Sequence, residues 1–299
     1  MKISRRTFLY LTTAAICAAG ALLLAYSYFI EPQRLTVARY RVGVAGWDNR
    51  FDGLRIVAIS DIHAGSNGSD ADKLRRVVET VNNERPDIIV LLGDYVSRRT
   101  DDRSQLRMPL AEMSEALKGM KAVFGVFAVL GNHDGVDDGP EISASLAANG
   151  YRVLDGEVVE IEKDGAKIRL LGLKDHLTIK SWKQFSDDAK EILARSGEDD
   201  SNIIALEHSP DVLPMLTEGD QMISPHFKIL LAGHTHGGQI FLPVLGRPIV
   251  PSFYGQKYAY GHIKENGVDM FVTSGVGTNV LPFRFLVPPE IAIVEIHGV

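Results

Sequence analysis

The sequence predicts a single α/β domain with a strand-rich second half, preceded by an N-terminal hydrophobic helix. From residue 54 to residue 148, apolar runs of strand length alternate with stretches of helical spacing, and most later segments read as strands. Hydrophobic residues make up 45% of the 299 residues and charged residues 23%, which is ordinary globular composition. A disordered chain and a coiled coil are therefore excluded.

The first 30 residues predict an export signal or a membrane anchor. Lys2, Arg5 and Arg6 precede residues 7–30, which contain no charged side chain. As a helix rising about 1.5 Å per residue, this stretch exceeds the roughly 30 Å hydrocarbon core of a bilayer. A buried core helix is the alternative, but polar positions at helical period are missing. The positive charges place the N-terminus in the cytoplasm and the body outside.

The same segment resembles a twin-arginine export motif, Ser4-Arg5-Arg6-Thr7-Phe8-Leu9. The twin-arginine export machinery is therefore an expected partner. Cleavage near Ala25-Tyr26-Ser27 and retention as an uncleaved anchor both stay open. The lone cysteine, Cys17, excludes internal disulfides and cysteine-ligated metal sites. Residues 31–53, polar with scattered valines, are expected to be a linker and lead-in to one domain at 54–299.

The first half of this domain alternates strands with helices. Continuous apolar runs of five or six residues predict buried strands, and Leu74, Val77 and Val81 recur at the spacing of one helix face. The expected elements are strands at 54–59, 88–92 and 123–130, and helices at 71–82, 105–117 and 141–148.

The second half is richer in strands and includes two hairpins, across Asp164-Gly165 and Asn266-Gly267. No internal repeat or second linker interrupts it. The expected strands are 158–161, 167–171, 203–206, 228–231, 258–263, 269–273 and 291–296, and the expected helices are 182–195 and 211–216.

Five of the predicted strands run directly into polar clusters. In an open α/β sheet, ligands bind beyond the carboxyl ends of strands, so these clusters are expected to converge. Carboxylates, imidazoles and one amide suit hard or borderline divalent metals, and their number suits two ions with a bridging carboxylate. The clusters contain Asp61 and His63; Asp94; Asn132, His133 and Asp134; His208; and His234 and His236.

Each of these residues also has an ordinary structural alternative. An Asp or Asn after a strand is commonly a turn former or helix cap. Gly93, Gly131 and Gly233 precede candidate ligands, where the backbone must turn sharply or approach another segment closely, or they are simple turn glycines. The remaining histidines, expected to be structural, are His176, His226, His262 and His297.

The ordered blocks resemble those of the calcineurin-like metallophosphoesterases. Together with the twin-arginine start, the stretch 233–242 followed by Pro243 is similar to the bacterial branch of exported or membrane-tethered phosphoesterases. The resemblance implies two facing mixed β-sheets flanked by helices, with the site on loops at one edge. The blocks are Asp61-Ile62-His63, Gly93-Asp94, Gly131-Asn132-His133-Asp134, His208 and Gly233-His234-Thr235-His236.

The resemblance also implies a role for each candidate residue. Asp94 would bridge two divalent ions (manganese, iron or zinc), and a metal-bridging hydroxide would be the nucleophile. His133 would stabilise the transition state or protonate the leaving oxygen, and Asp134 would orient His133 by accepting its second N–H. The ligands would be Asp61, His63 and His236 for one metal and Asn132, His208 and His234 for the other.

The substrate is expected to be a phosphate ester, and a membrane tether would favour lipid-linked esters by raising their local concentration. Arg98, Arg99 and Arg284 are candidate contacts for an anionic substrate. The alternative for the first two is a solvated charged loop offset by neighbouring aspartates, and for Arg284 simple packing. With a formal net charge of −6, the chain has no global attraction to nucleic acid, and no nucleic-acid partner is expected.

The favoured function is hydrolysis of phosphodiesters outside the cytoplasmic membrane. A pyrophosphatase of a nucleotide–lipid intermediate, like the UDP-diacylglucosamine hydrolases, is an alternative that requires a site on the cytoplasmic side. A non-catalytic metal-binding or adhesion module is another. A metallo-β-lactamase-like hydrolase would want a His-x-His-x-Asp-His cluster, which the chain lacks.

Overall fold

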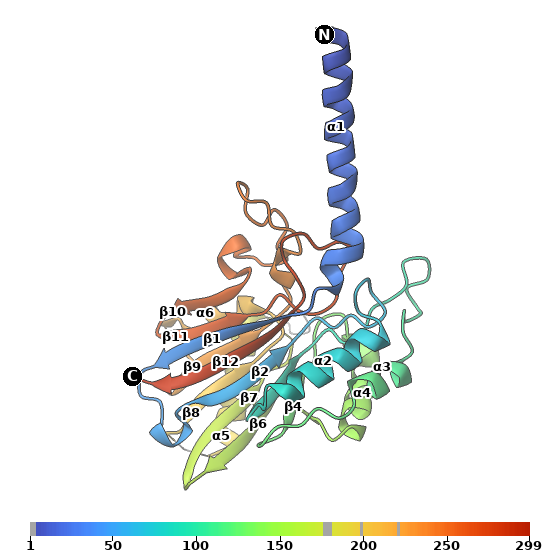
Figure 1. Ribbon diagram of the computed structural model, residues 1–299. Helices are drawn as coiled ribbons and strands as arrows, with labels where there is room; N and C mark the ends of the chain where they lie inside the picture. Colours follow the sequence, from blue (N-terminus) through green and yellow to red (C-terminus); the bar gives the residue numbers. More distant parts are fainter. Residues whose placement is uncertain (1–3, 176–180, 198–199, 220–221) are drawn as a thin grey trace.

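Two mixed β-sheets of six strands each face one another in the computed structural model, which describes residues 4–175, 181–197, 200–219 and 222–299 (Figure 1). The first sheet has the strand order β1-β12-β2-β3-β4-β5 and the second β10-β11-β9-β8-β7-β6. The first sheet contains β1 (Thr36–Val44), β2 (Leu54–Ile59), β3 (Ile88–Leu92), β4 (Val126–Val129), β5 (Arg152–Val153) and β12 (Glu290–Gly298). The second contains β6 (Glu157–Lys163), β7 (Ala166–Gly172), β8 (Asn202–Leu206), β9 (Phe227–Ala232), β10 (Gly261–Glu265) and β11 (Val268–Val272).

Alternation along each strand divides its side chains between two apolar layers. In β2, Ile56 and Ala58 join the core between the sheets, whereas Val57 and Ile59 pack outward against helices. Both faces are covered, so the central strands are continuous apolar runs. This result confirms the expected fold of two facing mixed sheets flanked by helices. The helices are α2 (Ala71–Asn83), α3 (Leu110–Leu117) and α4 (Gly135–Ala148) on the first sheet, and α5 (Trp182–Arg195) and α6 (Leu213–Thr217) on the second.

Helix α2 shows how the local sequence specifies one of these elements. The Asp70 side chain caps the helix by accepting a hydrogen bond from the Lys73 backbone N–H at 2.8 Å. Leu74, Val77 and Val81 then bury one face against the sheet. The helix ends within one residue of its expected boundary.

Strand β1 lies inside the stretch that was expected to be a linker, so that expectation is wrong for residues 36–44. The strand pairs in parallel with β12, with Thr36 opposite Glu290. It is an edge strand whose side chains alternate between a covered and an exposed face. Val42 and Val44 are buried on the covered face, and Arg41 is exposed on the other. This alternation dilutes the apolar signal and made the segment read as polar.

Three other boundaries differ from expectation for local reasons. Helix α3 begins only at Leu110, because Pro109 precedes it as the N-cap residue. Strand β4 begins at Val126, after Gly125 at φ +114°. Helix α4 starts directly after Asp134, several residues earlier than its apolar pattern indicated.

The N-terminal helix α1 (Arg5–Ala25) projects away from the two sheets (Figure 1). It continues through η1 (Tyr26–Ile30) and η2 (Glu31–Gln33), and an 18-residue window of this helical stretch has a mean hydropathy of 2.0. None of the residues of α1 is buried. By length and composition, this helical stretch could cross a membrane.

Candidate metal centre

The five polar clusters meet at one edge of the two sheets. Strands β2, β3 and β4 run parallel in one sheet, and β8 and β9 run parallel in the other. Each cluster follows the carboxyl end of one of these strands. The five sequence blocks are therefore assembled by topology, as the sequence predicted.

One group of three buried side chains could hold a metal ion. Candidate ligand atoms of Asp61, His63 and His236 lie within 4.8 Å of one another. His63 Nε2 is 3.1 Å from His236 Nε2, which in turn is 3.2 Å from Asp61 Oδ1. Two ligands bound to one ion at about 2.0–2.1 Å lie about 3 Å apart when they are at right angles.

A second group of buried side chains surrounds His208. Asp61, Asp94 and His208 also place ligand atoms within 4.8 Å of one another. His208 Nε2 lies 3.2 Å from Asp94 Oδ2, 3.1 Å from Asn132 Oδ1 and 3.2 Å from His234 Nδ1. Asn132 and His234, the two remaining candidate ligands, therefore each place one atom next to His208 Nε2.

Asp94 lies between the two groups. Its Oδ2 atom is 3.4 Å from His63 Nε2 and 3.2 Å from His208 Nε2. Its Oδ1 atom accepts a hydrogen bond from the His133 backbone N–H at 2.8 Å. One carboxylate thus contacts a histidine from each sheet and also fixes the loop that carries His133.

Backbone carbonyls set the tautomers of two of the histidines. His63 Nδ1 is 3.2 Å from the Val96 carbonyl oxygen, and His208 Nδ1 is 2.7 Å from the Leu92 carbonyl oxygen. A carbonyl only accepts, so each Nδ1 carries the proton. In a neutral ring, Nε2 is then left with a lone pair aimed at the centre.

The shifted pKa values of the buried carboxyl groups and histidines indicate that the cluster suits a bound cation. Burial raises the pKa of Asp61 to about 6 and lowers the pKa of His63 to about 4. Burial alone would lower the pKa of His208, but the Asp94 and Asp61 carboxylates raise it well above its usual value. Burial likewise opposes ionisation of Asp94, yet His208 and His63 hold the pKa of that carboxyl well below its usual range. A divalent cation would supply the same compensation.

A buried polar atom without a partner also indicates that these side chains suit divalent metals. Asp61 Oδ1, which lies 3.2 Å from His236 Nε2, is buried without a hydrogen-bond partner. Buried polar atoms normally have a partner, and a bound ion is one reason for an exception. Carboxylate oxygens, imidazole nitrogens and an amide oxygen suit manganese, iron or zinc alike.

Three glycines in front of candidate ligands are required by close packing. A Cβ on Gly131 would lie 2.4 Å from Asp94 Oδ1, and one on Gly233 would lie 1.8 Å from Ser60 Oγ. A Cβ on Gly93 would lie 2.5 Å from the Gly131 nitrogen. The close-approach interpretation of these glycines is confirmed.

His133 stands beside the ligands, and its partner was missed from the sequence. Its ring centroid is 4.9 Å from that of His63, and its Nε2 atom is 2.9 Å from Asn279 Nδ2. Asn279 Oδ1 accepts from the Val280 N–H, which orients the amide so that Nδ2 faces the ring. An Asn in a loop has no distinctive sequence signal, because only the fold brings residue 279 next to residue 133.

Asp134 is placed differently from the expectation that it accepts a hydrogen bond from the second N–H of His133. Its buried carboxylate accepts backbone N–H groups of Asp94 at 2.9 Å, Tyr95 at 2.8 Å and Gly131 at 2.8 Å. Burial, with the Asp94 charge, raises the pKa of Asp134 to about 7. Asp134 therefore joins the loops after β3 and β4.

The three candidate substrate arginines do not converge on the ligands. Arg99 is exposed and paired with Asp101, which matches a solvated charged loop, and Arg98 forms an ion pair with Asp138. Arg284 is fully buried, with its donors directed to backbone carbonyls. Its guanidinium therefore holds a loop together and does not face solvent. His176, expected to be structural, lies outside the described residues.

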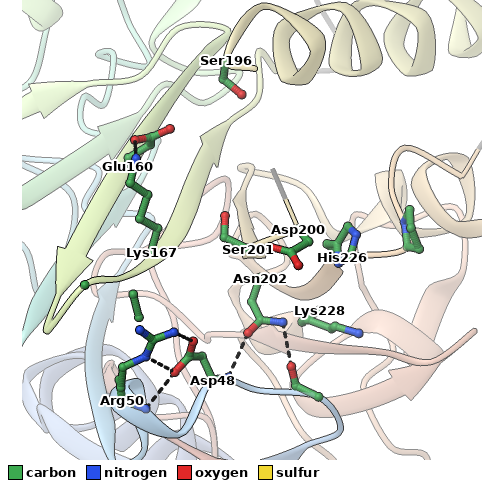
Figure 2. A pocket seen from close by; sticks show the side chains of 14 residues that line it. Asp48, Arg50, Glu160, Lys167, Ser196, Asp200, Ser201, Asn202, His226 and Lys228 are labelled. Atoms are coloured by element: carbon green, nitrogen blue, oxygen red, sulfur yellow. Dashed lines mark hydrogen bonds and ion pairs between the residues drawn. The ribbon is translucent and has the colours of Figure 1, made fainter. Parts of the chain in front are cut away.

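A cavity of 1230 Å³ is remote from this chemistry (Figure 2). It borders the first residue of β8, Asn202, and the start of β9, whereas His208 and His234 follow the opposite ends of these strands. Its charged lining is largely paired internally, as in Lys167 with Glu160 (Figure 2). Volume alone therefore does not locate the candidate site.

The fold and the cluster define a metal-dependent phosphoesterase, and the chain belongs to the calcineurin-like phosphoesterase family, whose model matches residues 54–238. It is 32% identical to the metallophosphoesterase YkuE of Bacillus subtilis, over 98% of this chain and 97% of that protein. It is 25% identical to the phosphodiesterase YaeI of Escherichia coli, over 98% and 99% respectively. A transmembrane protein with a metallophosphoesterase domain from Danio rerio is 28% identical over 96% of this chain and 62% of its own length.

Proposed function

We propose that the protein is a dinuclear metal-dependent phosphodiesterase whose catalytic domain lies outside the cytoplasmic membrane. The observation that carries this proposal is the position of Asp94, whose Oδ2 atom contacts His63 and His208, one from each ligand group. The relative from Escherichia coli bears the name phosphodiesterase, which favours diesters over monoesters as the first substrates to test.

The proposed ligand sets follow the two groups of side chains. Asp94 is the proposed bridge, and Asn132 contributes a neutral oxygen 3.1 Å from His208 Nε2. When bound, two divalent ions would acidify water at the site and offset the negative charge of the phosphate. The proposed ligands are Asp61, His63 and His236 for one ion and Asn132, His208 and His234 for the other.

His133 is the proposed acid. In the hydrolysis, the oxygen of water bonds to phosphorus, the bond to the leaving alkoxide breaks, and the alkoxide takes a proton. The Asp94 carboxylate holds the backbone of His133 next to the ligands. The Asn279 amide donates to His133 Nε2, so the proton that His133 gives up is the one on Nδ1. Asp134 supports this arrangement indirectly, because it joins the loops on which Asp94 and His133 are placed.

The proposed location outside the membrane rests on the N-terminal segment. Helix α1 and its continuation could span a bilayer, and the positive charges lie at its N-terminal end. The Danio rerio relative bears the name of a transmembrane protein. We further propose that residues 1–30 are the signal or anchor and that the catalytic domain starts at β1, since this strand pairs with β12.

The test is hydrolysis of bis-p-nitrophenyl phosphate and p-nitrophenyl phosphate by the full-length protein loaded with manganese. We expect turnover of the diester. On an alkyl phosphodiester, whose alkoxide leaves with a proton, His133→Ala should lower kcat by about 10²–10⁴-fold with the metal content unchanged. The loss should be smaller on the two p-nitrophenyl esters, because p-nitrophenolate leaves without a proton. Asp94→Ala should lose both metal and activity.

His262→Ala is the matched control, because His262 pairs with Asp269 on the β10–β11 hairpin, away from the ligands. This variant should behave like the unaltered protein. Full activity of His133→Ala on an alkyl phosphodiester, or no diester turnover with two metal ions bound per chain, would contradict the proposal.

A further inference from the structure

We infer that two apolar loops beside the metal centre insert into the outer face of the membrane that α1 spans, and that the substrates are phosphate esters of membrane lipids. The loops, residues 240–253 and 279–286, are here named the apolar rim. The inference rests on the proposed function and goes further, because it assigns a substrate class and a surface.

The rim exposes large apolar side chains to an unusual degree. Val244 is 94% exposed, Val280 91% and Phe253 79%. Among the described residues outside the helical stretch 5–33, the exposed large apolar side chains beyond the rim are Val123, Met222 and Val299. Single exposed apolar residues are normal, but a gathered set marks a contact surface.

The charge of the rim favours a bilayer over water. Residues 240–253 and 279–286 contain no Asp or Glu, although the chain has 38 acidic residues. Of the two arginines in these loops, Arg284 is buried and Arg247 lies over the rings of Phe241 and Tyr260. No carboxylate would therefore have to be dehydrated on insertion.

The rim is held at the exit of α1. The Ser27 carbonyl accepts the Arg284 backbone N–H at 3.0 Å, and Asn67 Nδ2 donates to the carbonyls of Tyr28 at 2.7 Å and Pro282 at 2.8 Å. Tyr28 also packs edge-on against Phe283, with ring centroids 5.6 Å apart. Aromatic residues at the end of a spanning helix lie at the membrane–water interface, so the rim starts at that depth.

Figure 1 shows the consequence for the whole molecule. The loop after β9, coloured orange, projects toward the same end of the molecule as α1 and extends along the direction of the helix. The two sheets lie at the opposite end. Once α1 spans a bilayer, this loop reaches the bilayer surface first.

Hydrogen bonds fix the conformation of the second loop of the apolar rim. The buried Arg284 guanidinium donates to the carbonyl oxygens of Ser274, Gly277 and Val287 at 2.6–3.1 Å, which ties the second loop together from within. Val280 is held at φ +58°, a strained conformation for a β-branched residue. Asn279 stabilises this conformation by accepting the Val280 N–H at 2.8 Å.

A small cavity connects the rim to the metal centre. It has a volume of 160 Å³, and His236 and Asn279 line it together with Ile240, Ile249 and Leu281. Asn279 in turn contacts His133 Nε2. The cavity therefore places apolar walls next to the proposed acid, as needed to hold hydrocarbon adjacent to a phosphate ester.

The first arm of the test measures insertion of the full chain reconstituted into phosphatidylcholine vesicles. In a Cys17→Ser background, a polarity-sensitive fluorophore is attached at Val244→Cys or at Phe253→Cys. We expect blue-shifted emission and quenching by lipids that carry a nitroxide in the acyl chain. Val123→Cys is the matched control, because Val123 is an exposed apolar residue next to β4, at the end of that strand opposite the metal centre. It should report water.

The second arm compares lipid and soluble substrates under manganese. Vesicles contain phosphatidylglycerol as a diester or phosphatidic acid as a monoester, and bis-p-nitrophenyl phosphate is the soluble reference. In the triple variant Val244→Ser, Leu245→Ser, Phe253→Ser, the ratio of lipid to soluble hydrolysis should fall about tenfold or more, because apolar contact with the bilayer is lost. Val123→Ser should leave the ratio unchanged.

The outcomes separate this inference from the proposed function. A water-exposed label at 244 and 253, or equal loss of lipid and soluble hydrolysis in the triple variant, overturns the inference. Turnover of the soluble diester without any lipid hydrolysis overturns the substrate class and leaves the proposed function standing. Absence of turnover on every ester overturns the proposed function itself.

Discussion

Left-handed backbone at non-glycine residues is concentrated among the candidate metal ligands. Asp61, His63, Asp94, His234 and His236 have φ values between 42° and 69°. Each such residue costs on the order of 1–3 kcal/mol and persists only when its surroundings over-determine it. Here the surrounding hydrogen bonds, such as that from the His234 N–H to Asp61 Oδ2 at 2.9 Å, supply that restraint. The strain is a property of the site itself.

Gly131 is the residue at which this packing is least tolerant. We predict that Gly131→Ala lowers diester hydrolysis by at least about 10²-fold, since a displaced ligand costs catalysis steeply. Its Cβ would fall 2.4 Å from Asp94 Oδ1 and 2.9 Å from His208 Cγ, so both ligands must move. Metal content measured by mass spectrometry should fall in parallel.

Gly139→Ala is the matched control for this substitution. A Cβ there would meet only Leu130 Cδ1, at 3.2 Å, and Gly139 lies inside α4. This variant should retain activity, because the only close atom is the flexible end of the Leu130 side chain. Equal activity of the two alanine variants would contradict the packing argument.

At the scale of elements, the segment that follows the N-terminal helix contacts α2. Lys73 of α2 is fully buried, and its ammonium group donates to the Pro32 carbonyl oxygen in η2. Burial, with the charges of Arg284 and Arg76, lowers the pKa of Lys73 to about 7. The contact joins the segment that follows α1 to the catalytic domain through one ionisable group.

This contact predicts a pH-dependent stability. The pKa of Lys73 is lower in the folded than in the unfolded chain, so the unfolded chain binds more protons between about pH 7 and about pH 10. Stability therefore rises with pH across that window, by up to about 1.4 kcal/mol per pH unit from this group.

Lys73→Met isolates the contribution, because methionine keeps the buried length and removes the charge. Chemical unfolding of both full-length proteins in detergent, at pH 6.5 and at pH 9, provides the measurement. We expect the unaltered protein to gain stability relative to Lys73→Met as the pH rises. Parallel curves for the two proteins would contradict the assignment to this lysine.

At the scale of the whole molecule, the metal centre closes one edge of the interface between the two sheets. The candidate ligands follow β2, β3 and β4 on one side and β8 and β9 on the other. Bound ions would therefore hold the two sheets together at the end where the loops, and not the apolar core, make the contacts.

Removal of metal should lower the stability of the whole chain. At an ion concentration about 100 times Kd, binding stabilises by about 2.7 kcal/mol, which corresponds to roughly 5–10 °C in Tm. Thermal unfolding before and after chelation, and after return of manganese, measures the change. Asp94→Ala should show no response to chelation, whereas His133→Ala should respond fully. An identical Tm with and without metal would contradict a centre that links the sheets.

The sequence by itself determined the elements and blocks whose signal is local. The buried strands, the helix at 71–83 and the polar residues after each strand were all predictable, because periodicity and strand-end chemistry need no distant partner. The edge strand β1 was missed because one of its two faces is exposed and largely polar. The convergence of five clusters was also predictable, since the carboxyl ends of parallel strands share one edge.

Only the tertiary structure decided which partner each polar side chain found. Asp134 accepts backbone N–H groups, Arg284 donates to backbone carbonyls, and Asn279 reaches His133 from a loop 146 residues away. Backbone donors and acceptors occur at nearly every residue, so the sequence does not distinguish among them. The position of α1 beside the candidate metal centre is likewise determined by contacts between segments that are distant in the sequence. These contacts depend on how the loops fold across the edge of the two sheets.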